Sequence, residues 1–249
     1  MRNDWIQADW PAPPNVRAFS TTRSGGVSRG PWSSLNLGLH CGDDPSLVEQ
    51  NRARLSEIVP APVHWLHQVH GTSVVRHSAR VTCELEGDAL VSFEPQQVCA
   101  VLTADCLPVL FCNRRGDRVG IAHAGWRGLA SGILEATVKA LDEAPNELMA
   151  WMGPAIGPRV YEVGSDVAEA FPDEFPAGFT RHGERFLLDI YSVAKLKLAV
   201  AGIQAVYGGR YCTMSDPERF FSYRRDGVTG RMASLLWLDD PESGAEKPA

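Results

Sequence analysis

Residues 107–141 read LPVLFCNRRGDRVGIAHAGWRGLASGILEATVKAL, and this stretch decides the fold class. The apolar run from Leu107 to Cys112 predicts a strand, residues 113–117 predict a turn, and residues 118–123 predict the second strand of a hairpin. After the sharp connection AGWRG, apolar residues recur at helical spacing from Leu129 to Leu141. The stretch therefore predicts a strand hairpin that leads directly into a helix.

Shorter strands and helices extend this pattern toward both ends of the chain without a regular alternation. The segments that we predict as strands are 16–22, 63–67, 73–76, 98–103, 148–152, 186–188 and 233–238. The predicted helices are 45–58, capped by Asp43 or Asp44, 166–171 and 191–201. Because strands pair locally and helices intervene irregularly, we expect an α/β protein of the α+β kind, with a mixed sheet rather than a doubly wound parallel one.

The length of the chain fits one domain. Its 249 residues lie near the upper limit that a single hydrophobic core supports, and no linker divides them. We therefore expect one domain over residues 1–249, ending in a polar tail at 239–249 that is disordered.

Charge and hydropathy argue against two classes of partner. The formal net charge is −6 and the lysines and arginines are scattered, so no basic face for nucleic acid is expected. No stretch approaches the ~20 apolar residues that a membrane span needs, and the first residues lack the apolar segment of a signal peptide. We expect a cytoplasmic protein without nucleic-acid or membrane partners. Its oligomeric state is open.

The six cysteines are expected to be reduced in that compartment. None of them forms a C-x-x-C pair, which argues against a zinc ribbon or a thioredoxin-type redox centre. Most of them are expected in the core, because a free cysteine packs as a small hydrophobic side chain.

Three of the seven histidines lie within seven residues, at positions 64, 67 and 70. Alternate residues of a strand share a face, so His64, Gln68 and His70 would point one way and His67 the other. Each histidine taken singly is more often a surface or core residue with ordinary hydrogen bonds. Their clustering is the reason to consider them as ligands.

Two further motifs place polar residues where predicted strands end. Asp105 and Cys106 follow the apolar strand 98–103, and functional residues often lie at such ends. His123 ends the hairpin, and Arg127 lies near a helix N-terminus, which favours anions. Taken singly, a buried cysteine is more often a packing residue and an arginine a surface ion pair.

Taken together, one cysteine and two histidines offer the sulfur and nitrogen ligands that suit zinc. Three protein ligands leave a fourth position for water or substrate, which is typical of a catalytic site, and a water bound there has a pKa of about 7. The ligands lie far apart in the sequence. The residues alone leave open which clustered histidine joins Cys106 and His123.

Seven motifs, in family order, resemble the YfiH-type family. This family is also called the laccase-domain or multicopper polyphenol oxidase-like family, and it includes the peptidoglycan editing factor. The motifs begin near residue 20, are highly specific in combination, and no element is missing. They are TTRSGGVS at 21–28, SLNLG at 34–38, HQVHG at 67–71, TADC at 103–106, HAGWRG at 123–128, GPAIG at 153–157 and FSYRRDG at 221–227.

The resemblance implies an α/β/β/α sandwich similar to the catalytic domain of the cytotoxic necrotizing factor toxins. It implies zinc held by His70, Cys106 and His123, with copper in members once called laccases. It further implies phosphorolysis of adenosine, inosine and methylthioadenosine, together with adenosine deamination. The partners would then be a purine nucleoside and phosphate.

Individual roles follow as hypotheses from the chemistry of the side chains. Guanidinium groups bind planar anions by a fork, so three arginines are candidates to bind phosphate or to polarise the purine. Asp105 is a candidate general acid or base, or a contact for ribose hydroxyls. The candidate catalytic residues are Asp105, Cys106 and His123. The candidate substrate-binding residues are Arg23, Asn36, His67, Gln68, Arg127 and Arg225.

Three other functions stay open. Copper in the same site would suit a polyphenol oxidase, although the chain offers one site and no His-x-His pair. Without metal, Cys106 as nucleophile and His123 as base would suit an amidase that edits a peptidoglycan precursor. A non-enzymatic binding module would need a fourth protein ligand, such as His67 or Asp105, to close a structural zinc site.

Overall fold

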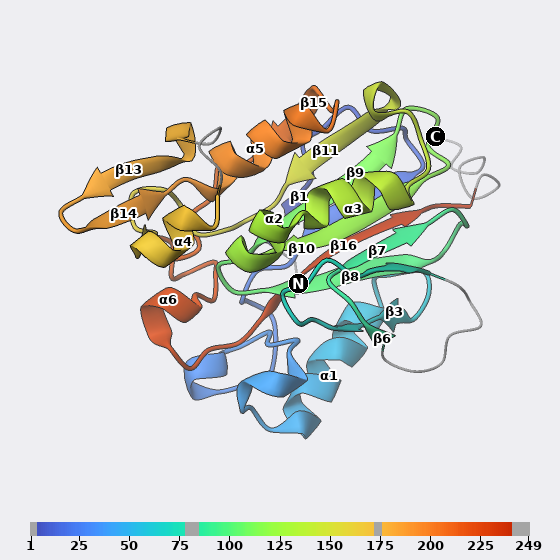
Figure 1. Ribbon diagram of the computed structural model, residues 1–249. Helices are drawn as coiled ribbons and strands as arrows, with labels where there is room; N and C mark the ends of the chain where they lie inside the picture. Colours follow the sequence, from blue (N-terminus) through green and yellow to red (C-terminus); the bar gives the residue numbers. More distant parts are fainter. Residues whose placement is uncertain (1–3, 78–84, 172–175, 241–249) are drawn as a thin grey trace.

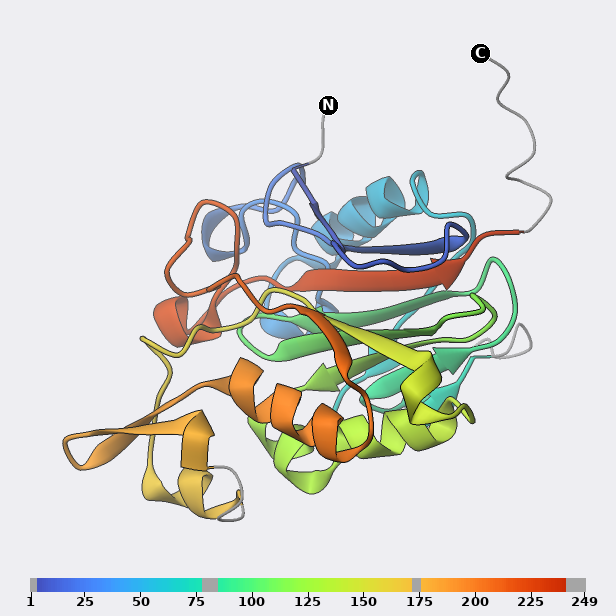
Figure 2. The ribbon, with the colours of Figure 1, turned by 90° about the horizontal axis from the view of Figure 1, so that it is seen from above.

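Two mixed sheets lie face to face at the centre of the computed structural model, which describes residues 4–77, 85–171 and 176–240 (Figures 1 and 2). The five-stranded sheet has the order β1 (Ile6–Gln7), β2 (Val16–Ser20), β16 (Met232–Leu238), β8 (Val98–Thr103) and β3 (Val63–His64). The six-stranded sheet has the order β15 (Ala205–Gly208), β11 (Leu148–Met152), β9 (Leu107–Asn113), β10 (Val119–Ala124), β7 (Ala89–Ser92) and β5 (Val74–Arg76).

Smaller elements surround these sheets. One small sheet joins β12 (Glu162–Val163), β14 (Arg185–Leu188) and β13 (Phe179–His182), and another joins β4 (Leu66–His67) and β6 (Leu85–Glu86). The α-helices are α1 (Pro45–Ser56), α2 (Trp126–Ser131), α3 (Ile133–Ala140), α4 (Ser165–Glu169), α5 (Ile190–Val200) and α6 (Tyr223–Asp226). None of the helices among the described residues has the length and apolar character that crossing a bilayer requires.

Side-chain alternation on the central strands builds a stack of four layers. Along β9, Phe111 packs with α3 and α5, whereas Leu110 lies in the core between the two sheets. Along β8, Val101 enters that same central core, whereas Ala100 packs on the outer side with Leu55 of α1. The layers therefore run from α3 and α5 through the six-stranded sheet and the five-stranded sheet to α1 (Figure 2).

This mixed α+β architecture confirms the predicted class. The six-stranded sheet pairs β11 with β15 and β5 with β7 in parallel, and its remaining pairs are antiparallel. The predicted hairpin is confirmed as β9 and β10, with Leu107 opposite Ala124 and Pro108 opposite His123. The likeness to the necrotizing factor domain stays a prediction.

The single helix predicted over residues 129–141 is wrong. The chain forms α2 and α3 instead, and they are separated by Gly132, which has a φ of 98° in the left-handed region. This residue closes the C-terminus of α2 and precedes the first turn of α3. The apolar spacing of the sequence is continuous across the break, so periodicity alone did not reveal it.

Other segments also differ from the prediction or decide between its alternatives, and strands β7 and β15 were not predicted. The strand expected over 63–67 divides into β3 and β4, and the chain leaves the extended conformation after His67, so the shared face predicted for His64, Gln68 and His70 is wrong. The partner strand β13 was not predicted. Asp44, rather than Asp43, caps α1 by accepting from the Ser46 N–H. Residues 241–249 of the predicted tail lie outside the described residues.

Replacing Gly132 with alanine is expected to destabilise the protein by about 1–2 kcal/mol, because a Cβ disfavours the left-handed conformation. The measurement is the free energy of unfolding from urea denaturation. Ser131→Ala, at the exposed neighbouring position of α2, is the matched control and should change stability by no more than about 0.5 kcal/mol. Equal stability of the two variants would contradict the role assigned to Gly132.

Candidate metal centre and adjoining cavity

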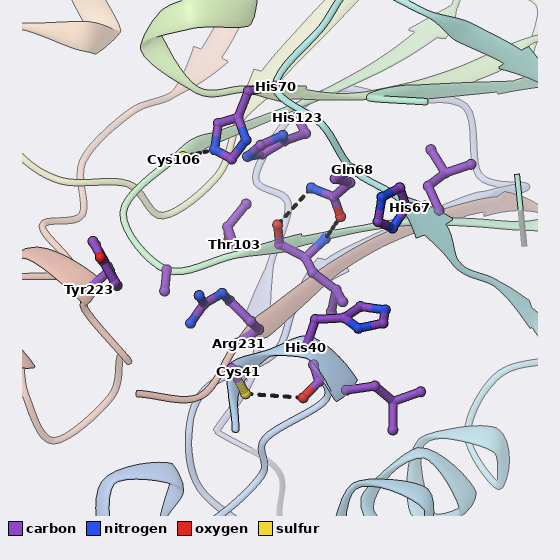
Figure 3. Close-up of a pocket in the computed structure, with 15 residues that line it drawn as sticks. His40, Cys41, His67, Gln68, His70, Thr103, Cys106, His123, Tyr223 and Arg231 are labelled. Atoms are coloured by element: carbon purple, nitrogen blue, oxygen red, sulfur yellow. Dashed lines mark hydrogen bonds between the residues drawn. The ribbon is translucent and has the colours of Figure 1, made fainter. Parts of the chain in front are cut away.

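His70, Cys106 and His123 come together at one end of the sheets, as a group that could bind a metal ion. Their ligand atoms all lie within 4.8 Å of one another. Cys106 Sγ lies 3.8 Å from His70 Nε2, and the centroids of the two imidazole rings are 4.7 Å apart. The three residues come from separate segments: the loop after β4, the connection from β8 to β9, and β10. Figure 3 shows the three side chains converging.

His123 is directed toward the centre by the alternation of β10. Val119 and Ile121 of this strand lie in the core between the sheets, and His123 shares their face at the strand's end. Its Nδ1 is hydrogen-bonded to Asp88 Oδ1 at 2.8 Å, and both side chains are buried. Nε2 is thereby left to face the metal centre. A carboxylate behind a histidine ligand fixes the orientation and tautomer of the ring.

The same carboxylate shapes the loop that carries His70. Asp88 accepts hydrogen bonds from the backbone N–H groups of Val69, His70 and Gly71, at 3.2, 2.9 and 2.7 Å. His70 adopts a φ of 61°, which is uncommon for a residue with a side chain. The three backbone hydrogen bonds hold this conformation and bring the His70 ring to Cys106.

The hairpin register places Cys106. Since Leu107 lies opposite Ala124, the preceding Cys106 meets the following Gly125. A Cβ on Gly125 would lie 2.9 Å from His70 Cδ2, 3.0 Å from Cys106 Sγ and 3.6 Å from His123 Nε2. The absence of a side chain at position 125 therefore allows the backbone to close one side of the centre.

The electrostatics of the group favour a thiolate. Burial opposes ionisation of Cys106, but His123 and His70 outweigh it and lower the pKa of the thiol to about 6. Burial likewise opposes a charge on His123, but Cys106 and Asp88 outweigh it and raise the pKa of the imidazole to about 9. Asp88 keeps a pKa below its ordinary value despite its burial, because His123 and the backbone N–H groups stabilise the carboxylate.

A cavity of about 450 Å³ opens beside the three ligands, within the ~300–1,000 Å³ range of small-molecule sites. His70, Cys106 and His123 form part of its wall (Figure 3). The rest of the lining is Gly38, Leu39, His40, Cys41, Leu66, His67, Gln68, Leu102, Thr103, Ala104, Tyr223 and Arg231. The centre therefore faces a space that can hold a small substrate.

Two of the residues predicted to bind substrate line this cavity. The Gln68 side chain donates to the Leu102 carbonyl at 3.0 Å and accepts from the Leu102 N–H at 2.8 Å, which fixes the amide against β8. The His67 ring packs edge to face on His40, with the ring centroids 5.9 Å apart. Both are in place to form part of the substrate wall.

Asn36 lies behind the cavity wall rather than in it. The buried side chain accepts from the N–H groups of Gly38 and Arg231, and it donates to the Gly38 carbonyl and to Asp43. It thereby fastens the segment 38–41, which lines the cavity, to the start of β16.

The three arginines proposed from the sequence lie outside the lining of the cavity. Arg225 donates to the carbonyls of Thr213, Met214 and Phe220 and pairs with Asp226. Arg23 donates to the carbonyls of Ser33 and Pro217, beside a separate hollow. Arg127 is exposed and its guanidinium lies over the Trp126 ring. Their roles in substrate binding stay predictions.

Asp105 precedes Cys106 but its carboxylate is bound on another side of the chain. It accepts from Thr213 Oγ1 at 2.5 Å and from the Arg224 N–H at 2.6 Å. The backbone φ of Asp105 is 95°, again in the left-handed region. These contacts fix the turn that carries Cys106. A catalytic role for Asp105 stays a prediction.

Four residues of the site that carry polar or charged groups lie outside every motif quoted from the sequence. Asp88 precedes a short apolar run, a pattern too common to single it out. His40 and Cys41 belong to a short 3₁₀ segment, and Arg231 stands just before β16. Arg231 lies in no quoted motif. Only the folding of distant segments around the cavity reveals it.

The chain is similar over most of its length to known proteins. Residues 17–239 match the family described as multi-copper polyphenol oxidoreductase laccase. A purine nucleoside phosphorylase of Pseudomonas aeruginosa is 53% identical over 243 residues, covering 96% of this chain and 100% of that protein. The purine nucleoside phosphorylase YfiH of Escherichia coli is 51% identical over 238 residues, covering 94% and 98%.

Solved structures show the same fold. A crystal structure of a Neisseria meningitidis protein superposes with a TM-score of 0.92 at 49% identity, covering 95% of this chain and 100% of the other. YlmD from Geobacillus stearothermophilus gives a TM-score of 0.89 at 34% identity, covering 96% and 97%. With the family match extending over most of its length, the chain belongs to the laccase-like YfiH family.

Proposed function

We propose that this protein is a zinc-dependent purine nucleoside phosphorylase of the cytoplasm. It would act on adenosine, inosine and methylthioadenosine, and would also deaminate adenosine. The observation that carries the proposal is the cavity of about 450 Å³ whose wall contains His70, Cys106 and His123. Relatives that share about half of their residues with this chain over nearly its full length are named purine nucleoside phosphorylases.

The donor set suits zinc. One thiolate sulfur and two imidazole nitrogens are ligands that zinc accepts, and Asp88 supports His123 from behind. Among the described residues the group contains three candidate ligands. Asp105, considered above as a fourth ligand, instead accepts hydrogen bonds from Thr213 and Arg224. When bound, zinc would supply a Lewis acid with a position open to substrate, and copper would compete for the same donors.

The cavity wall suits a nucleoside. A purine has an apolar face and a polar edge, and the wall combines Leu39, Leu66 and Leu102 with hydroxyl and imidazole groups. Tyr223 lines the cavity and keeps 61% of its surface exposed, so its ring is available for stacking. These residues would bind and orient the nucleoside beside His70 and Cys106.

Metal-analysed protein is expected to release hypoxanthine from inosine only when phosphate is present. Cys106→Ala and His70→Ala should lower this rate by at least about 100-fold, because each removes a ligand. Cys212→Ser, outside the cavity, is the control and should keep the activity. Chromatography of the products measures the outcome. Zinc-loaded protein that releases no hypoxanthine would contradict the proposal.

Asp88→Asn is expected to weaken zinc binding about 10- to 100-fold while preserving the shape of the side chain. An amide cannot match the carboxylate in stabilising His123 and the three backbone N–H groups. Competition with a chromophoric chelator measures the affinity, and circular dichroism checks the fold. The control is Asp142→Asn, an exposed site 87% accessible to solvent. If Asp88→Asn binds zinc as tightly as the original protein, the supporting role assigned to the Asp88 carboxylate is wrong.

One observation favours a second candidate, a metal-free amidase that acts on a peptidoglycan precursor. Asp88, His123 and Cys106 form a carboxylate–imidazole–thiol series, as a nucleophilic cysteine requires. The lowered pKa of Cys106 and the raised pKa of His123 correspond to a thiolate beside an imidazolium. This candidate would also fit a fold resembling the necrotizing factor deamidases.

In metal-free protein, alkylation of Cys106 by iodoacetamide is expected to rise with a midpoint near pH 6. The pKa of this thiol lies below its ordinary value, so the reactive thiolate is already formed at neutral pH and is lost only below about pH 6. Peptide mass spectrometry measures the rate, and His123→Ala should move the midpoint upward. A midpoint near pH 9 would contradict the thiolate. Protection by stoichiometric zinc would favour the metal enzyme over the amidase.

A further inference from the structure

One permanently charged side chain, that of Arg231, lines the cavity and belongs to none of the motifs quoted above. Among the described residues that line it, Arg231 is the only lysine or arginine, and none of the lining residues is acidic. The histidines at the metal centre lie on another part of the same wall (Figure 3). A charged substrate in the cavity would therefore meet Arg231 without competition from a neighbouring carboxylate.

The hydrogen bonds of Arg231 leave one edge of its guanidinium available. Nη1 donates to the carbonyl oxygens of Thr229 and Gly230, at 2.9 and 3.0 Å, which uses both of its hydrogens. Within the described chain, Nε and Nη2 make no hydrogen bond, and Arg231 takes part in no ion pair. These two nitrogens form the edge that binds two oxygens of one anion side by side.

The backbone and stem of Arg231 are held in place. Its N–H donates to Asn36 Oδ1 at 2.9 Å, and the side chain passes against Gly38, where an added Cβ would lie 2.7 Å from Arg231 Cγ. In Figure 3 the guanidinium points toward the side of the cavity that Tyr223 lines. A pre-positioned fork loses little freedom when an anion binds.

Other lining groups can also donate hydrogen bonds. His40 and His67 line the same cavity, with ring centroids 5.9 Å apart, and each ring offers an N–H donor. The cavity is also large enough for two small molecules to lie together, one at the metal centre and one at Arg231.

We infer that Arg231 binds the phosphate that reacts with the nucleoside. The inference rests on the proposed phosphorolysis and names the residue that holds its second substrate. A phosphate oxygen would form a bond to C1′ of the ribose as the bond from C1′ to the purine nitrogen breaks. The purine leaves with the electron pair and takes up a proton from the phosphate, giving free base and ribose 1-phosphate.

Titration of the nucleoside-free, full-length protein with inorganic phosphate in a calorimeter tests the binding step directly. Arg231→Gln should weaken phosphate binding about 10- to 100-fold, the value of a charged two-pronged hydrogen bond. The KM for phosphate should rise by the same factor, and the KM for inosine should change by less than about threefold. Arg181→Gln, an exposed arginine on β13, is the matched control.

The variant Arg231→Lys distinguishes the contribution of the two parallel guanidinium donors from that of the positive charge. Lysine keeps the positive charge but lacks the pair of parallel donors, so a loss of about tenfold in phosphate affinity is expected. If circular dichroism shows that Arg231→Gln does not fold, Arg231→Lys alone tests the inference. A phosphate affinity of Arg231→Lys equal to that of the original protein would overturn it.

The remaining outcomes separate the inference from the proposed function. Phosphate-dependent release of hypoxanthine with an unchanged phosphate KM in Arg231→Gln would overturn the role of Arg231 and leave the phosphorylase intact. Phosphate binding that depends on Arg231, without any release of hypoxanthine, would support the anion site and contradict the phosphorylase. Absence of phosphate binding at millimolar concentrations would overturn the anion site.

Discussion

The site depends on one buried carboxylate. The Asp88 carboxylate is hydrogen-bonded to His123 Nδ1 and accepts hydrogen bonds from three consecutive backbone N–H groups of the loop that carries His70. Without it, the positive φ of His70 and the orientation of His123 would each lack the contact that holds them. Removing one partner of such a buried network leaves the other groups unsatisfied at a cost of about 1–3 kcal/mol each. The hydrogen bonds that shape the candidate metal centre are therefore the same ones that stabilise the local fold.

The position of the centre follows from how the two sheets are joined. Cys106 lies on the connection from β8, in one sheet, to β9, in the other, and His123 ends the strand that pairs with β9. Three segments that are distant in the sequence thus meet at the connection from β8 to β9, where the chain passes from one sheet to the other. The cavity opens at this end because the segment 38–41 and the start of β16 border it, fastened together by Asn36.

The sequence predicted what depends on local pattern and motif. The hairpin from Leu107 and the mixed α+β class are confirmed, because alternation and turn residues act between neighbours. The break at Gly132 was missed, since the apolar spacing on its two sides is continuous. The three ligands were named from motifs, and the structure brings them together. Asp88 and Arg231 could not be predicted, because their roles arise from contacts between segments far apart in the chain.

The bare α-carbon of Gly125 also limits how this protein can evolve. Every other amino acid adds at least a Cβ, which would lie within 3.0 Å of both His70 and Cys106. The two atoms that such a Cβ would meet belong to the candidate ligands themselves, so any adjustment that relieves the contact moves His70 or Cys106. A substitution at position 125 would therefore disturb the candidate metal centre, although this residue itself carries no functional group.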